Sequence, residues 1–236
     1  CDILHNIVYN MKQLILFEGG CFMPIPIDHT KPVRTTAKLH AFNQLQQWII
    51  DGTLQPDEKL NDIELAQALG VSRTPIRESL QLLESQGFVS MQPGRATQVT
   101  PVEPEDIYNL LPPLAALQAL AAELATPNMD EEILNMLEEK NKEFATALQA
   151  KEFTKALKID EEFHQLIVDR ANNPYIFSMV EMLQAHVRRL YYYEKINLRE
   201  QSIKQHQELI QLFKDKEVSK LTEVMRANWI YTIEEF

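Results

Sequence analysis

The stretch Asp62–Leu83 reads DIELAQALGVSRTPIRESLQLL and predicts two short helices joined by a tight turn. Gly70 suits the left-handed backbone that often ends a helix. Ser72 is a good N-cap for the second helix, and Pro75 falls in its first turn, where the missing N–H costs nothing. Apolar residues at helical spacing give each helix one buried face. These residues are Leu65, Ala66 and Leu69 in the first helix and Ile76, Leu80 and Leu83 in the second.

The opposite face of the second helix is polar and carries Arg73, Thr74, Arg77 and Gln81. Arginine can form hydrogen bonds with a phosphate or with the edge of guanine, and glutamine can form them with adenine. The face therefore has the side chains that the recognition helix of a helix-turn-helix uses to read DNA. The alternative is an ordinary helical hairpin whose polar face is only solvated.

The sequence after the second helix predicts a small β-hairpin. Residues 88–91 form one apolar strand and residues 97–100 form another, with the turn signal Pro93-Gly94 between them. Arg95 lies at the tip of this hairpin. A helix-turn-helix followed by a hairpin with a basic tip is typical of a winged helix.

Residues 36–100 resemble the DNA-binding domain of the GntR superfamily of bacterial regulators. The matching runs are DGTLQPDEKL at 51–60, ELA at 64–66, LGVSRTPIRESL at 69–80 and ESQGF at 84–88. The resemblance implies that the recognition helix and the wing contact DNA. The implied contacts are Ser72, Arg73, Thr74 and Arg77 on the helix and Gly94 and Arg95 on the wing, beside Gln81 from the polar face.

One family feature is missing from the middle helix. In FadR-like members an arginine near the start of that helix often contacts DNA as well. Residues 62–64 read DIE and offer no basic side chain. We therefore expect one DNA contact to be absent or supplied elsewhere.

Length and charge limit the number of domains and the kind of DNA binding that we expect. The chain has 236 residues, 45% of them hydrophobic, and a formal net charge of −11, so we expect one or two domains with real cores. Residues 34–103 hold 6 basic and 8 acidic side chains, whereas residues 104–236 hold 15 and 23. The repulsive charge lies mostly in the C-terminal half. This predicts weak non-specific DNA binding and reliance on a specific paired site.

The N-terminal residues 1–33 are an extension before the winged helix. Glu18-Gly19-Gly20 can be encoded by a purine-rich run that resembles a ribosome-binding site, which makes Met23 the expected natural start and residues 1–22 translated upstream sequence. The alternative is an amphipathic helix over Ile3–Phe17 that packs on the body. A secretory signal fits poorly, because no basic segment precedes the apolar residues.

Cysteine and hydropathy point to the compartment. The two cysteines, Cys1 and Cys21, both lie in that extension, and the rest of the chain has none, which suits a reducing cytoplasm. No apolar run approaches the length of a membrane span. We therefore expect a cytoplasmic protein that does not engage a membrane.

The predicted fold class is mainly α. Residues 34–100 form the winged helix-turn-helix, with a first helix at Thr35–Asp51, and residues 101–104 form a short linker. From residue 105 to 236 the composition predicts an all-α antiparallel bundle. Its expected helices are 105–125, 129–149, 152–171, 174–196, 199–215 and 217–235, with Pro112-Pro113 breaking or kinking the first. This combination resembles the FadR subgroup, in which the helical half is an FCD-type domain that binds a ligand and dimerises.

The helical half carries one cluster of potential metal ligands. Asp160 and His164 are four residues apart on one helix and can face a single point, and His206 lies on a later helix. The resemblance implies one divalent metal, such as zinc, nickel or manganese, held by these three and a fourth ligand at Asn228. Asparagine is a poor substitute for imidazole with transition metals. The alternative is a polar cluster that hydrogen-bonds a ligand or water.

The effector pocket is expected to be less charged than is usual in the family. The positions that normally carry an arginine and a glutamate on the first helix of the bundle are Leu114 and Gln118 here. Arg188 and Arg189 are candidates to hold a carboxylate, although either can be a surface charge. Of the neighbouring tyrosines, we expect Tyr192 to line the pocket.

These features favour a transcription regulator that acts as a homodimer on a palindromic DNA operator and is controlled by a small metabolite, such as a carboxylate. The competing class is a metal-dependent hydrolase using Asp160, His164 and His206. It lacks an evident general base beside the metal and leaves the winged helix unexplained. A protein–protein adaptor that uses the wing is a third class.

Overall fold

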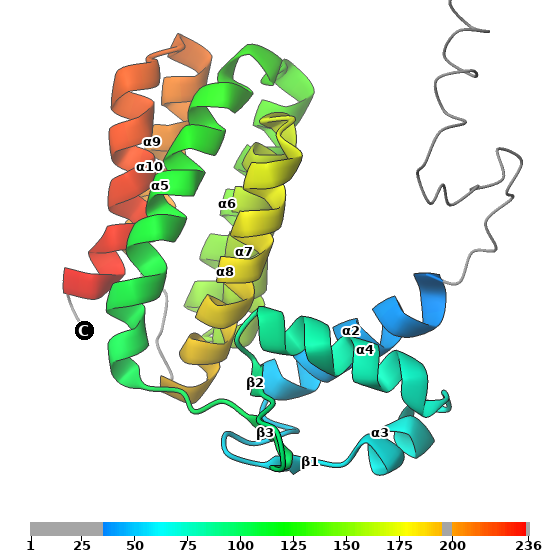
Figure 1. The fold of residues 1–236 in the computed structure, drawn as a ribbon. Coiled ribbons are helices and arrows are strands. Elements are labelled where there is room, and N and C mark those ends of the chain that lie inside the picture. The colour runs from blue at the N-terminus through cyan, green and yellow to red at the C-terminus, as the bar shows by residue number, and fades with distance from the viewer. Residues whose placement is uncertain (1–34, 195–199, 235–236) are drawn as a thin grey trace, which may run out of the picture. The chain divides into compact units, whose positions relative to one another are not determined.

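The computed structural model describes residues 35–194 and 200–234 (Figure 1). The predictions for residues 1–33, including the start at Met23 and the helix Ile3–Phe17, lie outside the described residues.

The winged-helix elements follow the order that the sequence predicts. Gly70 ends the middle helix in the left-handed region (φ 65°), and its N–H donates to the carbonyls of Ala66 and Gln67. The elements are α2 (Thr35–Ile50), β1 (Lys59–Leu60), α3 (Asp62–Leu69), α4 (Arg73–Ser85), β2 (Val89–Ser90) and β3 (Thr97–Val99).

The sheet of this domain has one strand more than the predicted hairpin. Its order is β1-β3-β2 and both pairings are antiparallel, with Leu60 opposite Thr97 and Val89 opposite Val99. A two-residue strand is too short to show the alternation that identifies strands in a sequence. Pairing with β3, almost 40 residues later in the chain, creates it.

The core of the winged helix joins the apolar faces of α2 and α4. Leu45 and Ile49 of α2 and Ile76 and Leu83 of α4 are almost completely buried, and Phe88 is buried with them at the start of the wing. The predicted face of α4 is therefore confirmed. Its burial turns the polar face of the same helix toward solvent, as expected for an amphipathic helix.

The helical half forms the predicted bundle, with α5 packed against α7, α8 and α10 (Figure 1). Observed and predicted helix ends agree to within two residues wherever both ends are described. The elements are the 3₁₀ turns Pro104–Asp106 and Thr126–Asn128 and the helices α5 (Ile107–Ala125), α6 (Glu131–Gln149), α7 (Phe153–Arg170), α8 (Pro174–Glu194), α9 (Glu200–Asp215) and α10 (Val218–Glu234). Among the described helices, none combines the length and apolarity that crossing a membrane requires.

The two prolines of α5 do not break it, so of the two predicted outcomes, a break or a kink, the break is excluded. Pro112 and Pro113 lie inside one continuous helix. They cannot donate to the carbonyls of Tyr108 and Asn109. These two residues are exposed, so water can satisfy their carbonyls.

Candidate functional site

The predicted DNA contacts all lie at the surface of the winged helix. Ser72 holds the N-cap position of α4 in an extended conformation, but its side chain makes no capping hydrogen bond. Its hydroxyl is therefore not used by its own helix. The exposed residues are Ser72, Arg73, Thr74, Arg77 and Gln81 of α4 and Gly94 and Arg95 of the wing.

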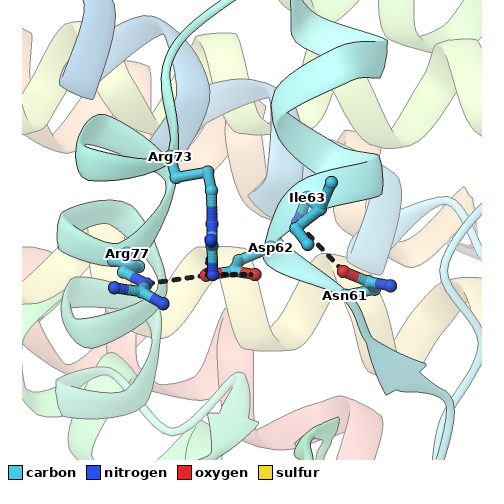
Figure 2. Close-up of polar contacts among 5 residues, drawn as sticks. All are labelled: Asn61, Asp62, Ile63, Arg73 and Arg77. Carbon is cyan, nitrogen blue, oxygen red and sulfur yellow. Dashed lines mark hydrogen bonds and ion pairs between the residues drawn. The ribbon is translucent and has the colours of Figure 1, made fainter.

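The two arginines of α4 share one carboxylate (Figure 2). Asp62 Oδ2 accepts from Arg77 Nε at 2.6 Å and from Arg73 Nη2 at 3.0 Å, and Asp62 Oδ1 accepts from Arg73 Nη2 at 3.1 Å. The hydrogen bonds from Arg77 and then Arg73 hold the pKa of the Asp62 carboxyl below its usual value. Asp62 is thus ionised at neutral pH, and the three residues carry a net charge of +1.

The tip of the wing is a tight turn. Gly94 has a positive φ of 77°, and no atom lies within 4 Å of the place where a Cβ would stand. Arg95 closes the turn through its N–H to the Gln92 carbonyl (3.0 Å), and its guanidinium donates to the Gln92 side chain (2.8 Å). A groove separates the wing from α4, with Arg77 and Gln81 on one side and Thr97 on the other. The wing and the recognition helix therefore border one hollow.

The bundle brings together the three predicted metal ligands. Asp160 and His164 of α7 and His206 of α9 are buried, and one potential ligand atom from each lies within 4.8 Å of the others. His206 Nε2 is 3.4 Å from Asp160 Oδ1. Two residues one turn apart on α7 and a residue some 40 positions later thus meet at a single point.

Asn141 fixes how His206 presents its ring. The Asn141 side-chain amide donates to the Ile203 carbonyl at 3.1 Å, so its oxygen is the atom that faces His206 Nδ1, also at 3.1 Å. His206 Nδ1 therefore carries the proton and Nε2 offers its lone pair toward Asp160. No sequence pattern indicated this role, because Asn141 lies on α6, 65 positions before His206.

Burial sets the protonation of this cluster. It raises the pKa of Asp160 to about 8, with the neighbouring Glu161 adding to the effect. Burial also lowers the pKa of His164 to about 3, against the raising effect of the nearby Asn228, and lowers that of His206 well below its usual value. Without a cation the cluster is uncharged at neutral pH.

The bundle interior holds polar atoms that lack partners. Within the described residues, neither ring nitrogen of His164 and neither amide atom of Gln118 makes a hydrogen bond, although both side chains are fully buried. An unpaired buried polar group is costly, so such groups mark places where water, an ion or a ligand belongs. Sequence analysis noted Gln118 only as a missing charge. The feature of the sequence that could have indicated this role is that Gln118 is a single polar residue within an otherwise apolar run.

The donor set suits a divalent metal. Two neutral imidazoles and one carboxylate are ligands that zinc, nickel and manganese all accept. The unpaired nitrogens of His164 and the lone pair of His206 Nε2 fit this interpretation. The amide nitrogen of Asn228 donates to Gln205 at 3.0 Å, which leaves its carbonyl oxygen as a weak fourth donor.

The predicted effector residues do not gather in one pocket. Arg188 pairs with Glu161 at 3.3 Å, one residue beyond Asp160. Arg189 is buried and donates to Thr100 Oγ1 at 2.9 Å, at the end of the wing. Tyr192 is 53% exposed and borders Gly52, where a Cβ would lie 2.9 Å from its ring. Only Arg188 thus lies near the buried cluster.

A groove between α9 and α10 lies close to Asn228. Its volume is about 640 Å³, and Gln205, which accepts the hydrogen bond from Asn228, forms part of its wall. Hydroxyl, carboxylate and guanidinium groups line it. They belong to Ser219, Thr222, Glu223, Arg226 and Tyr231.

Comparison with known proteins identifies the family. The FCD domain matches residues 107–229, and the family of bacterial regulatory proteins called gntR matches residues 37–99. The chain belongs to the GntR family and carries an FCD domain. Regulators of this family bind DNA operators, so the winged helix is a DNA-binding domain and the protein is a transcription regulator.

Named relatives agree with this assignment. The regulator YdhC of Bacillus subtilis is 30% identical over 75% of this chain and 81% of its own length. The regulator McbR of Escherichia coli is 30% identical over 80% and 90%. Both relatives are named as transcriptional regulators, so the hydrolase alternative is not favoured.

Solved structures share the fold. The structure of E. coli McbR/YncC aligns with a TM-score of 0.69 at 26% identity, over 85% of this chain and 98% of that one. A GntR regulator from Rhodococcus aligns with a TM-score of 0.63 at 18% identity, over 84% and 94%. At that identity the second match supports the fold alone.

Proposed function

We propose that this regulator binds a palindromic operator as a homodimer and that a small ligand in the FCD domain controls the binding. The observation that carries the DNA part is the exposure of all seven predicted contact residues along α4 and the wing tip. The proposed DNA surface therefore consists of the residues already predicted: Ser72, Arg73, Thr74, Arg77, Gln81, Gly94 and Arg95.

Alanine substitution of the two arginines tests this surface. We expect Arg73→Ala or Arg77→Ala to weaken binding to an operator, selected with the wild-type protein from random duplexes, by about 1–3 kcal/mol. Arg170→Ala removes one positive charge from the bundle and serves as the control. Binding that is unchanged in both variants would overturn the proposed surface.

The dimer follows from how little one winged helix can contribute. One recognition helix makes few base contacts and the chain is acidic overall, so useful affinity requires two half-sites and two-fold symmetry. The exposed face of α5 supports a second copy as the partner. Residues 107–122 of α5 contain no charged residue, and Leu120 on this helix is 43% exposed. Such a face is typical of an interface.

A charge placed on this face tests the dimer. We expect the wild-type protein to be a dimer by light scattering at micromolar concentration and Leu120→Glu to be a monomer, because association would bury the new carboxylate. Leu39→Glu introduces the same charge at an exposed leucine of α2 and should leave the dimer intact. A monomeric wild type, with and without operator, would contradict the proposal.

The ligand proposal rests on the buried cluster. Asp160, His164 and His206 would hold one divalent metal, and Asn228 would be a weak fourth ligand. When bound, the metal supplies a positive charge in a site that the protein itself leaves neutral. That charge would attract a small carboxylate, and Gln118 would add an amide with free donor and acceptor capacity.

Helix α8 supports a connection between this site and the DNA-binding domain. Its Arg188 pairs with Glu161, next to Asp160, and its Arg189 bonds to Thr100 at the end of the wing. One turn earlier, His186 stacks on Phe88 with ring centroids 4.1 Å apart. A ligand that shifts α8 would therefore act directly on the wing.

A further inference from the structure

Asp62 stands where the two arginines of the recognition helix meet. It is the first residue of α3, and the arginines lie 11 and 15 positions later on α4. Figure 2 shows both guanidinium groups joined to its carboxylate by hydrogen bonds. A negative charge at this place is unexpected, because the surface is meant for a polyanion.

The start of α3 does not require this carboxylate. Asn61 is the N-cap, and its side-chain oxygen accepts from the Ile63 N–H at 2.9 Å. The Asn61 amide in turn donates to Glu64 at 2.8 Å. The N-terminus of α3 is thus capped, and Glu64 already supplies an acidic group in its first turn.

The stability of the domain does not require it either. The arginine side chains are 49% and 60% exposed, and the Asp62 side chain is 21% exposed. Ion pairs at such exposure contribute little to folding. The role of the carboxylate must lie in what it does to the arginines.

The hydrogen bonds occupy one specific edge of each guanidinium. Arg73 bonds to Asp62 through Nε and Nη2, which form its side-on edge, and Arg77 bonds through Nε on the same edge. The end-on edge is made by Nη1 and the second N–H group of Nη2. In the described part of the chain, Nη1 of both arginines and Nη2 of Arg77 make no hydrogen bond to the protein. An end-on edge presents two parallel N–H groups, the arrangement that pairs with guanine O6 and N7.

We propose that Asp62 is a positioning residue for sequence discrimination, which holds Arg73 and Arg77 by their side-on edges and leaves the end-on edges for bases. This rests on the proposed function, because it requires both arginines to contact DNA. The carboxylate also cancels one of two positive charges, which lowers the attraction to phosphates of any sequence. Orientation and charge both favour specific over non-specific binding.

Asp62→Asn tests the proposal, with the selected operator and a scrambled duplex of equal length as probes. We expect binding to the scrambled duplex to strengthen and the ratio of operator to scrambled affinity to fall by at least about fivefold. The slope of log affinity against log salt should steepen by about 0.9 on the scrambled duplex. Asp62→Glu, which keeps a carboxylate within reach, should restore most of the ratio.

Glu64→Gln is the matched control. It removes the same charge from the same turn of α3 but does not touch either arginine, so the ratio should stay at the wild-type value. An unchanged ratio in Asp62→Asn, including an equal gain on both duplexes, would overturn the proposal, as would an equal fall in Glu64→Gln. Thermal unfolding establishes that each variant is folded.

Arg73→Ala and Arg77→Ala, measured on the same two duplexes, separate the two ideas. If both retain full operator binding, the proposed DNA surface is wrong and the role of Asp62 falls with it. If they lose binding and Asp62→Asn keeps its discrimination, only the positioning role is wrong.

Discussion

The winged helix and the bundle each contain a cluster that combines a carboxylate with nitrogen side chains, and the two clusters differ in burial. Asp62 and its arginines lie at the surface, and the carboxylate accepts hydrogen bonds from Nε and Nη2 of Arg73 and from Nε of Arg77. Asp160, His164 and His206 are buried, and His164 has no hydrogen-bond partner among the described residues. The surface cluster is therefore charged, whereas the buried cluster is neutral, although both combine a carboxylate with nitrogen side chains.

The difference indicates what each cluster can bind. Guanidinium groups lower the pKa of Asp62, so the surface cluster stays charged and can meet a polyanion. Burial raises the pKa of Asp160 to about 8 and leaves the interior cluster neutral. Because a neutral, unpaired cluster gains most from a cation or a small polar ligand, we expect a partner of the bundle to differ in kind from the DNA that the winged helix binds.

The largest expected effect comes from breaking the buried cluster. We expect the wild-type protein to bind zinc weakly enough to lose it to a chelator. His164→Ala should lower the affinity for zinc by about a hundredfold or more, which abolishes measurable binding, because only two strong ligands remain. Asn228→His should tighten binding, because it restores an imidazole.

Calorimetric titration with zinc measures all three proteins, and His40→Ala, which removes an exposed histidine outside the cluster, is the control. No binding by the wild type together with no gain in Asn228→His would remove the metal from the proposed function. The cluster would then be a polar floor for a ligand.

An intermediate effect is expected at Gln118, whose two amide atoms are both unpaired. Gln118→Leu replaces the amide by an apolar group of similar size. We expect the ligand-free protein to be more stable by about 1–3 kcal/mol, because the cost of an unsatisfied buried amide disappears. Chemical denaturation measures this difference, and Gln67→Leu at an exposed position of α3 should give no such gain. A destabilised Gln118→Leu would show that the amide has a partner in solution.

Local patterns account for what the sequence predicted well. The order of helices, the left-handed turn at Gly70 and the pair Asp160 and His164 all depend on residues within a few positions of one another. Helical spacing and capping preferences determine such features. His206 was also placed correctly, but through the family resemblance rather than through spacing.

What sequence analysis missed depends on contacts between distant segments. Asn141 meets His206 from 65 positions away, β1 exists only by pairing with β3, and Asp62 reaches Arg77 across the turn. Arg189 was predicted at the effector, yet its partner is Thr100, 89 positions earlier. No short-range pattern encodes these pairings, because packing of whole elements creates them.

The smallest expected effect concerns a third type of environment, the junction where α8 meets the winged helix. His186 is partly buried there, and its Nε2 is 2.7 Å from the Gln86 carbonyl, to which the neutral ring donates. Burial is the main cause that lowers its pKa below the usual 6.5, with a smaller lowering from Arg189. The hydrogen bond to Gln86 and the charge of Asp106 act in the opposite sense.

The direction of the pH effect follows from this shift. As pH falls below about 6.5, the unfolded chain binds a proton that the folded His186 does not, so stability declines. The lowered pKa values of the buried His164 and His206 also make stability fall as pH falls. The contribution of His186 must therefore be measured as a difference between two proteins. His186→Gln keeps a donor for the Gln86 carbonyl but does not titrate. Between pH 7.5 and 5.5 the wild-type Tm should therefore fall further than that of the variant, by a few degrees at most, since 1 kcal/mol shifts Tm by about 2–4 °C in a chain of this size. Parallel Tm profiles for the two proteins would show that His186 is not protonated differently in the folded and unfolded states.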